Sequence, residues 1–599
     1  MLKKQSFLKI LLLMLIYSTA LISAPVITNI SPNLGPSAGG NTVTITGSGF
    51  TGTIAVNFGS RAATFTVVSD TTITAIAPVS AAGDASITVT TPTGISALSQ
   101  QDLYVYQGSW YAYDADENGD ANPINLTTNT VLSPILIGPV PSAIAITPDA
   151  QTALYLTSNA AGLIFIDIAT NTVIGSVPFA SSVPAGIAIT PDGKSAYVAA
   201  NNQIIQISLA SHTIVDTISL PGARHIAIAP DGKLAYISFN LSQTLDILDL
   251  TTNTIIGNII GGSGGSIGQL AITPDGTLAY ATNVNLHTLL VYNLTTNTFS
   301  TSIPLATTSP QGLAITPDGQ LVFVANLVSD NVSVINVASQ SVIATISLSP
   351  SDPFDIAISP DGKTAYVSAQ VASEVIPINV ATLAPGTPIP LPSFGGPIAI
   401  TPDQAPVASF TFTSPNIFDA SSSRSAVGSI ATYSWDFGDG QTLTTASPII
   451  THDYAALGSY TVTLTVTNTA GTSTTQIFTG HTLSRNGGPS ARSSQVVTVL
   501  PPSPQPPASP SHFKGKSRRN QFATQTEYFN HLTWNPSFDP TIVAYQLFRN
   551  GRLIASIPAS GPFVYNDQNR QKNSHDVYTL IAVNAEGLQS IPVIITVKR

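Results

Sequence analysis

The densest acidic group in this chain places four carboxylates within seven residues. Oxygen-bearing side chains alternate and a glycine permits a sharp turn, in the order Asp114, Asp116, Asn118, Gly119 and Asp120. This spacing matches the first half of a calcium-binding loop, since Ca²⁺ takes several oxygen ligands. The position where such loops place a bidentate Glu holds Asn125 instead. The residues therefore leave two interpretations open, a Ca²⁺ site at Asp114, Asp116, Asn118 and Asp120 or a solvated acidic turn.

A second candidate site is the adjacent pair Arg224 and His225. An arginine can hold an anion and a histidine can transfer a proton near neutral pH. A site needs several converging groups rather than one pair, so a structural role is the competing interpretation.

The chain has no cysteine, which excludes thiol catalysis and disulfides.

Seven copies of a motif close to Ile-Ala-Ile-Thr-Pro-Asp-Gly organise the centre of the chain, at spacings of 39 to 44 residues. Their aspartates are Asp149, Asp192, Asp231, Asp275, Asp318, Asp361 and Asp403. Each unit contains four short apolar or alternating segments separated by turn residues, which is typical of a β-propeller blade. The aspartates recur in every unit, so we predict that they are turn residues rather than a site.

The ends of the repeat array predict how the ring closes. The last unit supplies one strand, at 397–401, and the three strands that it lacks lie upstream at 109–113, 123–126 and 131–137. Residues 107–404 are therefore predicted to form seven four-stranded blades, with one blade shared between both ends and no exposed sheet edge. Calcium at 114–120 would brace this closing blade.

The repeats resemble the YVTN family of propeller repeats, found in bacterial and archaeal surface proteins, through segments 280–283 and 323–326. Around the pair described above, residues 222–225 resemble a Gly-Pro-Arg-His segment of the seven-bladed lactonases that open 6-phosphogluconolactone. That resemblance implies that Arg224 holds an anion and His225 moves a proton. Ala223 replaces the expected Pro, and Phe239-Asn240 replaces Asn-Glu, which removes a carboxylate.

Three further regions resemble immunoglobulin-like β-sandwich families. Residues 25–106 resemble an IPT/TIG domain through the glycine-rich segment 35–40 and the strand 43–50. Residues 405–500 resemble a PKD domain through 433–440 and the alternating strand 460–468, with an insertion at 484–490. Residues 522–599 resemble a fibronectin type III domain through 532–534 and 545–551, with Trp534 and Tyr578 predicted in its core. The fold class is all-β.

Residues 1–24 are predicted to be a signal peptide, because three lysines precede a short apolar run and then small residues. Nothing later approaches the length of a transmembrane helix. Charged residues are only 9% of the chain and the net charge is -10, which disfavours nucleic acid as a partner. Residues 501–521 are predicted to be a proline-rich, basic linker.

These observations favour a secreted or cell-surface protein that binds an extracellular glycan or surface protein without catalysis, through a propeller displayed on immunoglobulin-like modules. One alternative is a propeller lactonase or hydrolase that uses Arg224 and His225. Another is a structural component of the cell envelope. No cofactor other than Ca²⁺ is expected.

Overall fold

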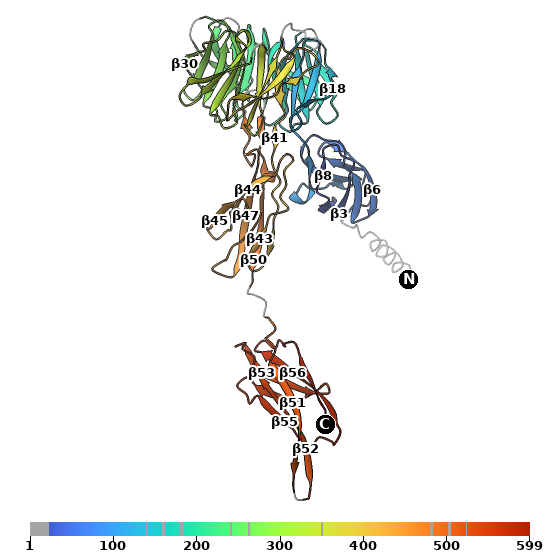
Figure 1. The fold of residues 1–599 in the computed structure, drawn as a ribbon. Helices are drawn as coiled ribbons and strands as arrows, with labels where there is room; N and C mark the ends of the chain where they lie inside the picture. Colours follow the sequence, from blue (N-terminus) through green and yellow to red (C-terminus); the bar gives the residue numbers. More distant parts are fainter. Residues whose placement is uncertain are drawn as a thin grey trace, which may run out of the picture. The chain divides into compact units, whose positions relative to one another are not determined.

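The computed structural model is built from β-strands and a few short 3-10 turns, as Figure 1 shows, and it confirms the all-β fold class. It describes residues 23–138, 140–158, 162–179, 184–239, 242–261, 264–348, 351–479, 483–500, 505–522 and 524–598. The predicted signal peptide therefore lies outside the described residues, apart from its last two positions. Within the described ranges, no helix has the length and apolar character needed to cross a membrane.

The first domain is a two-sheet sandwich. One sheet has the order β1-β3-β7-β6, with β1 Val26–Ser31, β3 Thr42–Ser48, β7 Thr72–Ile76 and β6 Thr64–Ser69. The other has the order β2-β10-β8-β4-β5, with β9 paired to β8; the bounds are β2 Leu34–Pro36, β10 Leu103–Gln107, β8 Gly83–Thr91, β4 Ala55–Phe58, β5 Arg61–Ala62 and β9 Gly94–Ile95. Side chains of both sheets fill the space between them, among them Ile45 and Tyr104, together with Phe50 from the loop after β3.

Seven separate sheets form the propeller, which confirms the predicted number of blades. The first blade has the order β13-β12-β11-β40, with β14 paired to β12; its strands are β11 Tyr111–Ala115, β12 Asp120–Asn125, β13 Thr130–Val131, β14 Ile135–Leu136 and β40 Ile398–Ile400. Blades two to four comprise β15 Pro141–Ile146, β16 Thr152–Thr157, β17 Gly162–Asp167 and β18 Thr172–Val177; β19 Pro184–Ile189, β20 Ser195–Ala200, β21 Gln203–Ser208 and β22 Thr213–Ser219; and β23 Ala223–Ile228, β24 Leu234–Phe239, β25 Ser242–Asp249 and β26 Thr254–Ile259.

The remaining blades follow the same up-and-down order. Blade five contains β27 Ile267–Ile272, β28 Leu278–Asn283, β29 Thr288–Asn293 and β30 Thr298–Pro304; blade six contains β31 Pro310–Ile315, β32 Leu321–Asn326, β33 Asn331–Asn336 and β34 Ser341–Ser347; blade seven contains β35 Pro353–Ile358, β36 Thr364–Ala369, β37 Glu374–Asn379, β38 Ala384–Pro385 and β39 Ile389–Pro390. Strand β40 pairs with β11 through Ala112–Ile400 and Asp114–Ile398, so the first blade combines strands from both ends of the array. The innermost strands, β15, β19, β23, β27, β31, β35 and β40, neighbour one another around the ring.

The Ile-Ala-Ile segment of each unit explains how adjacent blades pack. In β15, Ile144 and Ile146 pack against the first blade, whereas Ala145 faces the third blade and contacts the cluster that contains Ile187 and Ile189. Strand side chains alternate between the two faces of a sheet. A large residue on one face and a small one on the other therefore lets consecutive blades approach closely around a ring.

The aspartates behave as predicted in the complete units. Asp275 shows the pattern, because its Oδ1 accepts hydrogen bonds from the hydroxyl of Thr273 at 2.6 Å and from the backbone N–H of Thr277 at 3.0 Å. Asp403 differs from this pattern and corrects the prediction for the seventh motif. It is buried, and it accepts hydrogen bonds from Trp110 Nε1 at 3.0 Å and Asn468 Nδ2 at 2.6 Å. It therefore joins the first blade to the domain that follows.

That following domain is a sandwich with a small additional sheet. Its sheets have the orders β42-β43-β46, β45-β44-β47-β50 and β41-β49-β48. The bounds are β41 Asp403–Gln404, β42 Thr411–Thr413, β43 Ile417–Asp419, β44 Ile430–Asp436, β45 Thr442–Thr445, β46 Ile449–Thr451, β47 Gly458–Asn468, β48 Ile477–Phe478, β49 Leu483–Asn486 and β50 Arg492–Val499. The expected insertion at 484–490 is only part of a longer excursion, which starts at β48.

The first and third domains also contact each other directly. Arg424 Nη2 donates a hydrogen bond to the carbonyl of Leu103 at 2.7 Å, and the backbone N–H of Gly108 donates to the carbonyl of Ala426 at 3.1 Å. Val105 is buried beside Ala426 in a small apolar cluster. The chain segments that enter and leave the propeller are thus bonded to each other outside the ring.

The C-terminal residues, from 499 onward, form a separate compact unit. Its sheets are β51-β52-β55 and β54-β53-β56-β57, with β51 Ser511–Gln521, β52 Thr526–Asn535, β53 Ile542–Arg549, β54 Arg552–Pro558, β55 Val564–Asp567, β56 His575–Asn584 and β57 Val593–Lys598. Trp534 and Tyr578 are buried in its core. The likeness to a fibronectin type III domain stays a prediction.

The predicted linker at 501–521 is wrong for residues 511–521, because they form strand β51 of this unit. Phe513 is buried in the core, and the Cα of Gly515 faces Leu532 and Val597. The basic residues alternate with these positions. The basic residues predicted to belong to a linker are instead the outward side of an amphipathic strand.

Candidate functional site

The innermost strands of the propeller surround a cavity of about 400 Å³ along the axis of the ring. Its wall is made largely of the Ile-Ala-Ile segments, and most of its polar groups come from the second and third residues of the same strands. In blades two to seven, the third residues are Ala143, Gly186, His225, Gln269, Gly312 and Asp355. Three of the six blades thus carry a large polar side chain where the others carry Ala or Gly.

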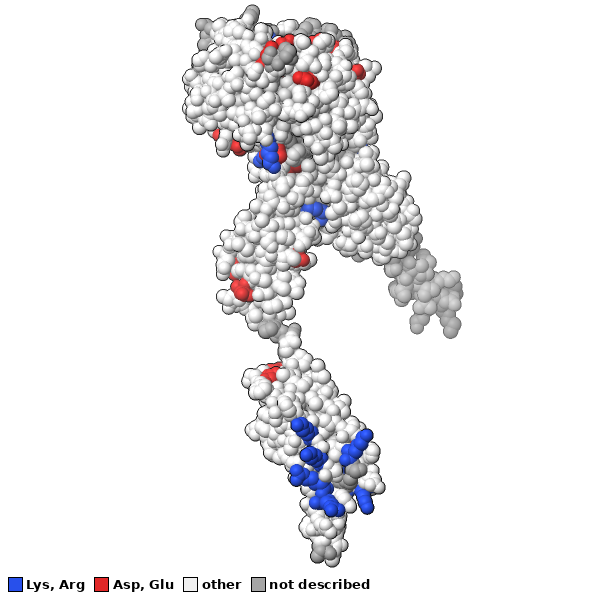
Figure 2. Space-filling model, viewed as in Figure 1, with Lys and Arg blue, Asp and Glu red and all other residues white. Residues whose placement is uncertain are grey.

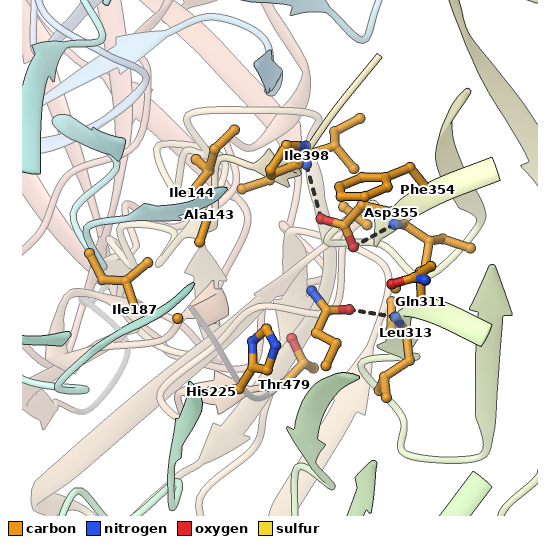
Figure 3. Close-up of a pocket in the computed structure, with 18 of the residues that line it drawn as sticks. Ala143, Ile144, Ile187, His225, Gln311, Leu313, Phe354, Asp355, Ile398 and Thr479 are labelled. Carbon is orange, nitrogen blue, oxygen red and sulfur yellow. Dashed lines mark hydrogen bonds between the residues drawn. The ribbon is translucent and has the colours of Figure 1, made fainter. Parts of the chain in front are cut away.

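Third-position side chains reach toward the innermost strand of the next blade. Gln269 Oε1 accepts a hydrogen bond from the backbone N–H of Leu313 at 2.5 Å, and Asp355 Oδ2 accepts one from Ile398 at 3.1 Å (Figure 3). The innermost strand of a blade has one edge without a neighbouring strand, and its buried peptide groups need partners. These two side chains supply such partners and link blades five to six and seven to one.

Asp355 is a buried acid in the cavity wall. Burial raises the pKa of Asp355 from 3.8 to about 6, although hydrogen bonds from the N–H groups of Ile398 and Ile356 and from Gln269 favour the carboxylate. The side chain is only 7% exposed, so the cost of removing the charge from water exceeds the gain from these donors. The cavity therefore contains a carboxyl group that changes its charge just below neutral pH.

This perturbation predicts a pH-dependent stability. Between about pH 4 and 6 the unfolded carboxyl is ionised while folded Asp355 keeps its proton, so the native state binds more protons and the free energy of unfolding falls as pH rises. The loss amounts to about 3 kcal/mol, at about 1.4 kcal/mol per pKa unit. Urea unfolding across this range should show a shallower decline for Asp355→Asn than for the wild type. Parallel pH profiles for the two proteins would contradict the assignment.

The sequence-predicted pair Arg224 and His225 does lie in the wall of this cavity. Arg224 Nη1 donates a hydrogen bond to Ser266 Oγ at 3.1 Å, and burial lowers its pKa. The backbone N–H of His225 donates to Ser238 Oγ at 3.2 Å, while its ring projects into the cavity, as Figure 3 shows. The structure thus brings the pair together with the polar groups of other blades, which a two-residue motif could not reveal.

Sequence analysis missed Gln269, Gln311 and Asp355, which line the same cavity. A signal for Gln269 and Asp355 was present. Aligning the seven repeat units on their Pro-Asp turns shows His225, Gln269 and Asp355 as polar exceptions at one column of an otherwise apolar or glycine position. A polar residue in a buried inner strand needs a partner or a ligand, which makes such columns informative.

One end of the cavity is closed by the third domain. Thr479, Leu483 and Ser484, from the hairpin of β48 and β49, line the cavity together with prolines of the Pro-Asp turns. Phe478 and Leu483 are 1% exposed and pack in an apolar cluster with residues of blades three and four. The hairpin therefore fills the channel at the face that carries the Pro-Asp turns.

The base of this hairpin is fixed to the same face. Arg485 Nε donates a hydrogen bond to the carbonyl of Pro360 at 2.7 Å, and Gln476 Nε2 donates to the carbonyl of Pro191 at 3.2 Å. Burial lowers the pKa of Arg485, while the nearby carboxylates of Asp403, Asp361 and Asp318 act in the opposite direction. The carboxylates of these Pro-Asp motifs thus favour the positive charge of Arg485.

The predicted calcium loop lies beside the cavity, and its residues do not all face the same way. Asp114 is fully buried, and its Oδ2 accepts a hydrogen bond from the backbone N–H of Gly396 at 3.3 Å. Burial raises the pKa of Asp114 well above its usual range, and the carboxylates of Asp116 and Asp355 raise it further. Asp114 therefore belongs to the wall between the first blade and the channel.

The other three predicted ligands form the turn itself. Asp116 is buried, and its Oδ1 accepts a hydrogen bond from the N–H of Asp120 at 3.0 Å, whereas Asn118 is exposed and donates to Ser393 Oγ at 2.6 Å. In the part of the chain that the structure describes, no three His, Cys, Asp or Glu side chains are arranged to hold a metal ion together. Calcium binding at this loop stays a prediction.

Calcium titration tests that prediction. A ligand that binds only the folded state at 100 times its Kd stabilises that state by about 2.7 kcal/mol. We expect Ca²⁺ to raise the Tm of the wild type, and Asp116→Asn to remove the rise by deleting one anionic ligand while keeping the size of the side chain. Asp192→Asn, in an exposed propeller turn, is the matched control. A Tm that does not respond to Ca²⁺ would identify the loop as an acidic turn.

Three family models match separate parts of the chain. The IPT/TIG domain model matches residues 25–106, the model of the seven-bladed β-propeller lactonase matches residues 206–346, and a PKD domain model matches residues 400–482. These matches agree with the sheets described above. The chain is a multidomain β protein in which a seven-bladed propeller stands between an IPT/TIG domain and a PKD domain.

Similarity to individual proteins is limited in extent. A curated relative is the pre-pro-metalloprotease PrtV of Vibrio cholerae serotype O1, strain M66-2, at 44% identity over 77 residues, which are 12% of this chain and 8% of that protein. The chain thus covers only a small fraction of that relative's length.

Solved structures with a similar fold are more distant. Kuenenia stuttgartiensis hydrazine synthase is 20% identical, with a TM-score of 0.40, over 44% of this chain and 90% of that chain. A functionally unknown protein from Desulfotomaculum acetoxidans is 18% identical, with a TM-score of 0.43, over 49% of this chain and 99% of that chain.

Proposed function

We propose that this chain is an extracellular, non-catalytic binding protein that receives part of a glycan in the propeller channel. The observation that carries the proposal is the cavity of about 400 Å³, whose isoleucine-rich wall carries Arg224, His225, Gln269 and Gln311. Small-molecule sites are mostly apolar concavities of about 300–1,000 Å³ with a few oriented polar groups. A pocket of this size suits one or two sugar units better than a protein surface.

The chemistry of the wall supports a polyhydroxylated ligand. Gln311 and Arg224 are only partly buried and offer amide and guanidinium donors, while the isoleucines offer apolar contact. Amide and guanidinium groups hydrogen-bond to hydroxyl or carboxylate oxygens. The predicted signal peptide and the IPT/TIG and PKD domains support the extracellular location.

A glycan array probed with the full chain tests the proposal. We expect selective binding, reduced about tenfold or more by Gln311→Ala and by Arg224→Ala, because one lost hydrogen bond to a buried ligand costs about 1 to 3 kcal/mol. Lys233→Ala is the control, since its side chain is 72% exposed on a propeller turn. The proposal fails if no glycan binds, or if the two cavity variants bind as well as the control.

A lactonase activity is the second candidate, favoured by the position of Arg224 and His225 in the same cavity as Asp355, whose pKa is raised to about 6. A carboxyl or imidazole group that titrates near neutral pH can act as a general acid or base. Hydrolysis of a lactone panel, lost in Arg224→Ala and in His225→Gln, would support this activity over simple binding. Equal hydrolysis by the wild type and both variants would exclude a lactonase activity that uses Arg224 and His225.

A further inference from the structure

The charges of this chain are divided unevenly between its two compact units. Residues 501–599 contain ten Lys and Arg and five Asp and Glu, whereas residues 25–500 contain eight basic and 26 acidic residues. The C-terminal unit is therefore positive inside a chain whose net charge is -10. Figure 2 shows Lys and Arg gathered on the C-terminal unit, while the rest of the visible surface is mostly uncharged, with small acidic and basic groups.

Strand β51 arranges three of these cations in a row. Lys514, Lys516 and Arg518 occupy alternate positions and are all exposed, while Phe513 and Gly515 face the core. Alternate residues of a strand lie on the same face, about 7 Å apart. The cations therefore form a straight row of regularly spaced positive charges.

No carboxylate lies directly opposite this row. The cross-strand neighbours on β52 are Thr533 for Lys514, His531 for Lys516 and Phe529 for Arg518. Among the residues that the structure describes, none of the three cations takes part in a salt bridge. Like charges on neighbouring positions repel one another, so the row maintains a positive potential that an external anion would relieve.

A groove runs beside the row. Strand β57 lies next to β51, and an open groove is lined by Lys516, Arg518 and Arg519 from β51, by Tyr528 from β52 and by Lys598 from β57. Tyrosine offers a flat apolar face together with a polar hydroxyl, a combination that suits a sugar ring. Tyr528 is the cross-strand neighbour of Arg519, so these two side chains lie on the face of the strand pair opposite to Lys516 and Arg518. The groove thus adds further polar and charged groups along the edge of β51, beside the row.

We propose that the outward face of β51, with Lys514, Lys516 and Arg518, binds a linear acidic polysaccharide through its carboxylate or sulfate groups. A regular row of cations fits a polymer with regularly placed anions. Double-stranded DNA carries one negative charge per about 1.7 Å, and the excess of acidic residues in the rest of the chain repels so dense a polyanion more than a polysaccharide with one charge per sugar. This inference is independent of the propeller cavity.

The test uses the full chain and immobilised polygalacturonate, which carries one carboxylate per sugar, with neutral dextran, dextran sulfate and single-stranded DNA in parallel. The test variant replaces Lys514, Lys516 and Arg518 together with glutamine. The control variant replaces the exposed propeller lysines Lys194, Lys233 and Lys363 with glutamine, which changes the net charge equally. A third variant, Lys514→Arg with Lys516→Arg, keeps the charges.

We expect polygalacturonate or dextran sulfate to bind in a salt-dependent manner and dextran not to bind. The β51 glutamine variant should lose about tenfold or more in affinity and show a weaker dependence on salt, because fewer counterions are released. The propeller control and the arginine variant should bind like the wild type. If both glutamine variants lose the same affinity, net charge alone explains the binding, and the proposal is overturned.

Two other outcomes would contradict an acidic polysaccharide as the partner. DNA bound about tenfold more tightly than either polysaccharide would identify a nucleic-acid surface. Self-association of the wild type that is lost in the β51 glutamine variant, without polysaccharide binding, would identify a second copy of the acidic chain as the partner. Unchanged Tm values across the variants would show that the fold is intact in each comparison.

Discussion

Asp403→Ala is expected to destabilise the propeller by about 3 kcal/mol and to make its first blade sensitive to proteolysis. Asp403 is 1% exposed and accepts hydrogen bonds from Trp110 and Asn468. Truncation removes this acceptor from the buried amide of Asn468 and from the partly buried indole of Trp110, at about 1 to 3 kcal/mol for each donor. The change also removes a link between the strand that closes the ring and the PKD domain, so both elements should loosen together.

The repeat array provides a matched control for this prediction. Asp231 occupies the same position of its unit, but its side chain is 56% exposed, and its Oδ1 accepts a hydrogen bond from the N–H of Lys233 at 3.0 Å. Asp231→Ala should cost about 1 kcal/mol or less. Calorimetry and a time course of thermolysin cleavage measure both variants. Similar losses would show that Asp403 acts as an ordinary turn residue.

Gly312→Ala should be the second large perturbation, costing about 3 kcal/mol. A Cβ atom at Gly312 would lie 2.5 Å from Asp355 Oδ1 and 2.6 Å from Asp355 Cα. The Cα cannot move without shifting the innermost strand of blade seven, so the two strands must separate. The carboxyl group of Asp355 then loses its place beside the N–H of Ile398, and ligand binding in the cavity should weaken as well.

Gly257 is the control for the effect of an added methyl group. It lies in the outer strand β26, and no heavy atom would lie within 4 Å of its Cβ. Gly257→Ala should leave the Tm unchanged or raise it slightly, because alanine has less conformational entropy to lose than glycine. If Gly312→Ala unfolds at the same temperature as Gly257→Ala, the close contact between Gly312 and Asp355 is contradicted.

The repeat pattern was sufficient to predict the ring because its information is local. Each Pro-Asp turn with its Ile-Ala-Ile strand indicates one blade, and the single strand at 397–401 predicts the shared first blade. Asp403 was misassigned because the motif around it is nearly intact. Gln404 stands in place of glycine, but Ala150 also does so after Asp149, where the ordinary turn forms. This difference therefore could not predict that strand β41 replaces the turn at Asp403.

The cavity could be predicted only in part. Arg224 and His225 stood out as a charged pair, and an alignment of repeat units would have added Gln269 and Asp355. Leu483 could not be found in this way, because its place in the channel depends on how the PKD domain packs against the propeller. Such contacts between domains have no periodic signature in the sequence.

The bonds between Leu103 and Arg424 and between Gly108 and Ala426 also determine the path of mechanical tension. A pull applied along the chain from the IPT/TIG domain to the PKD domain passes through these contacts before it reaches strands β11 and β40. The whole propeller is then a loop of chain outside the line of force. Such a ring keeps its channel geometry under tension until this direct junction breaks, and only then do the first blade's β11 and β40 begin to unzip.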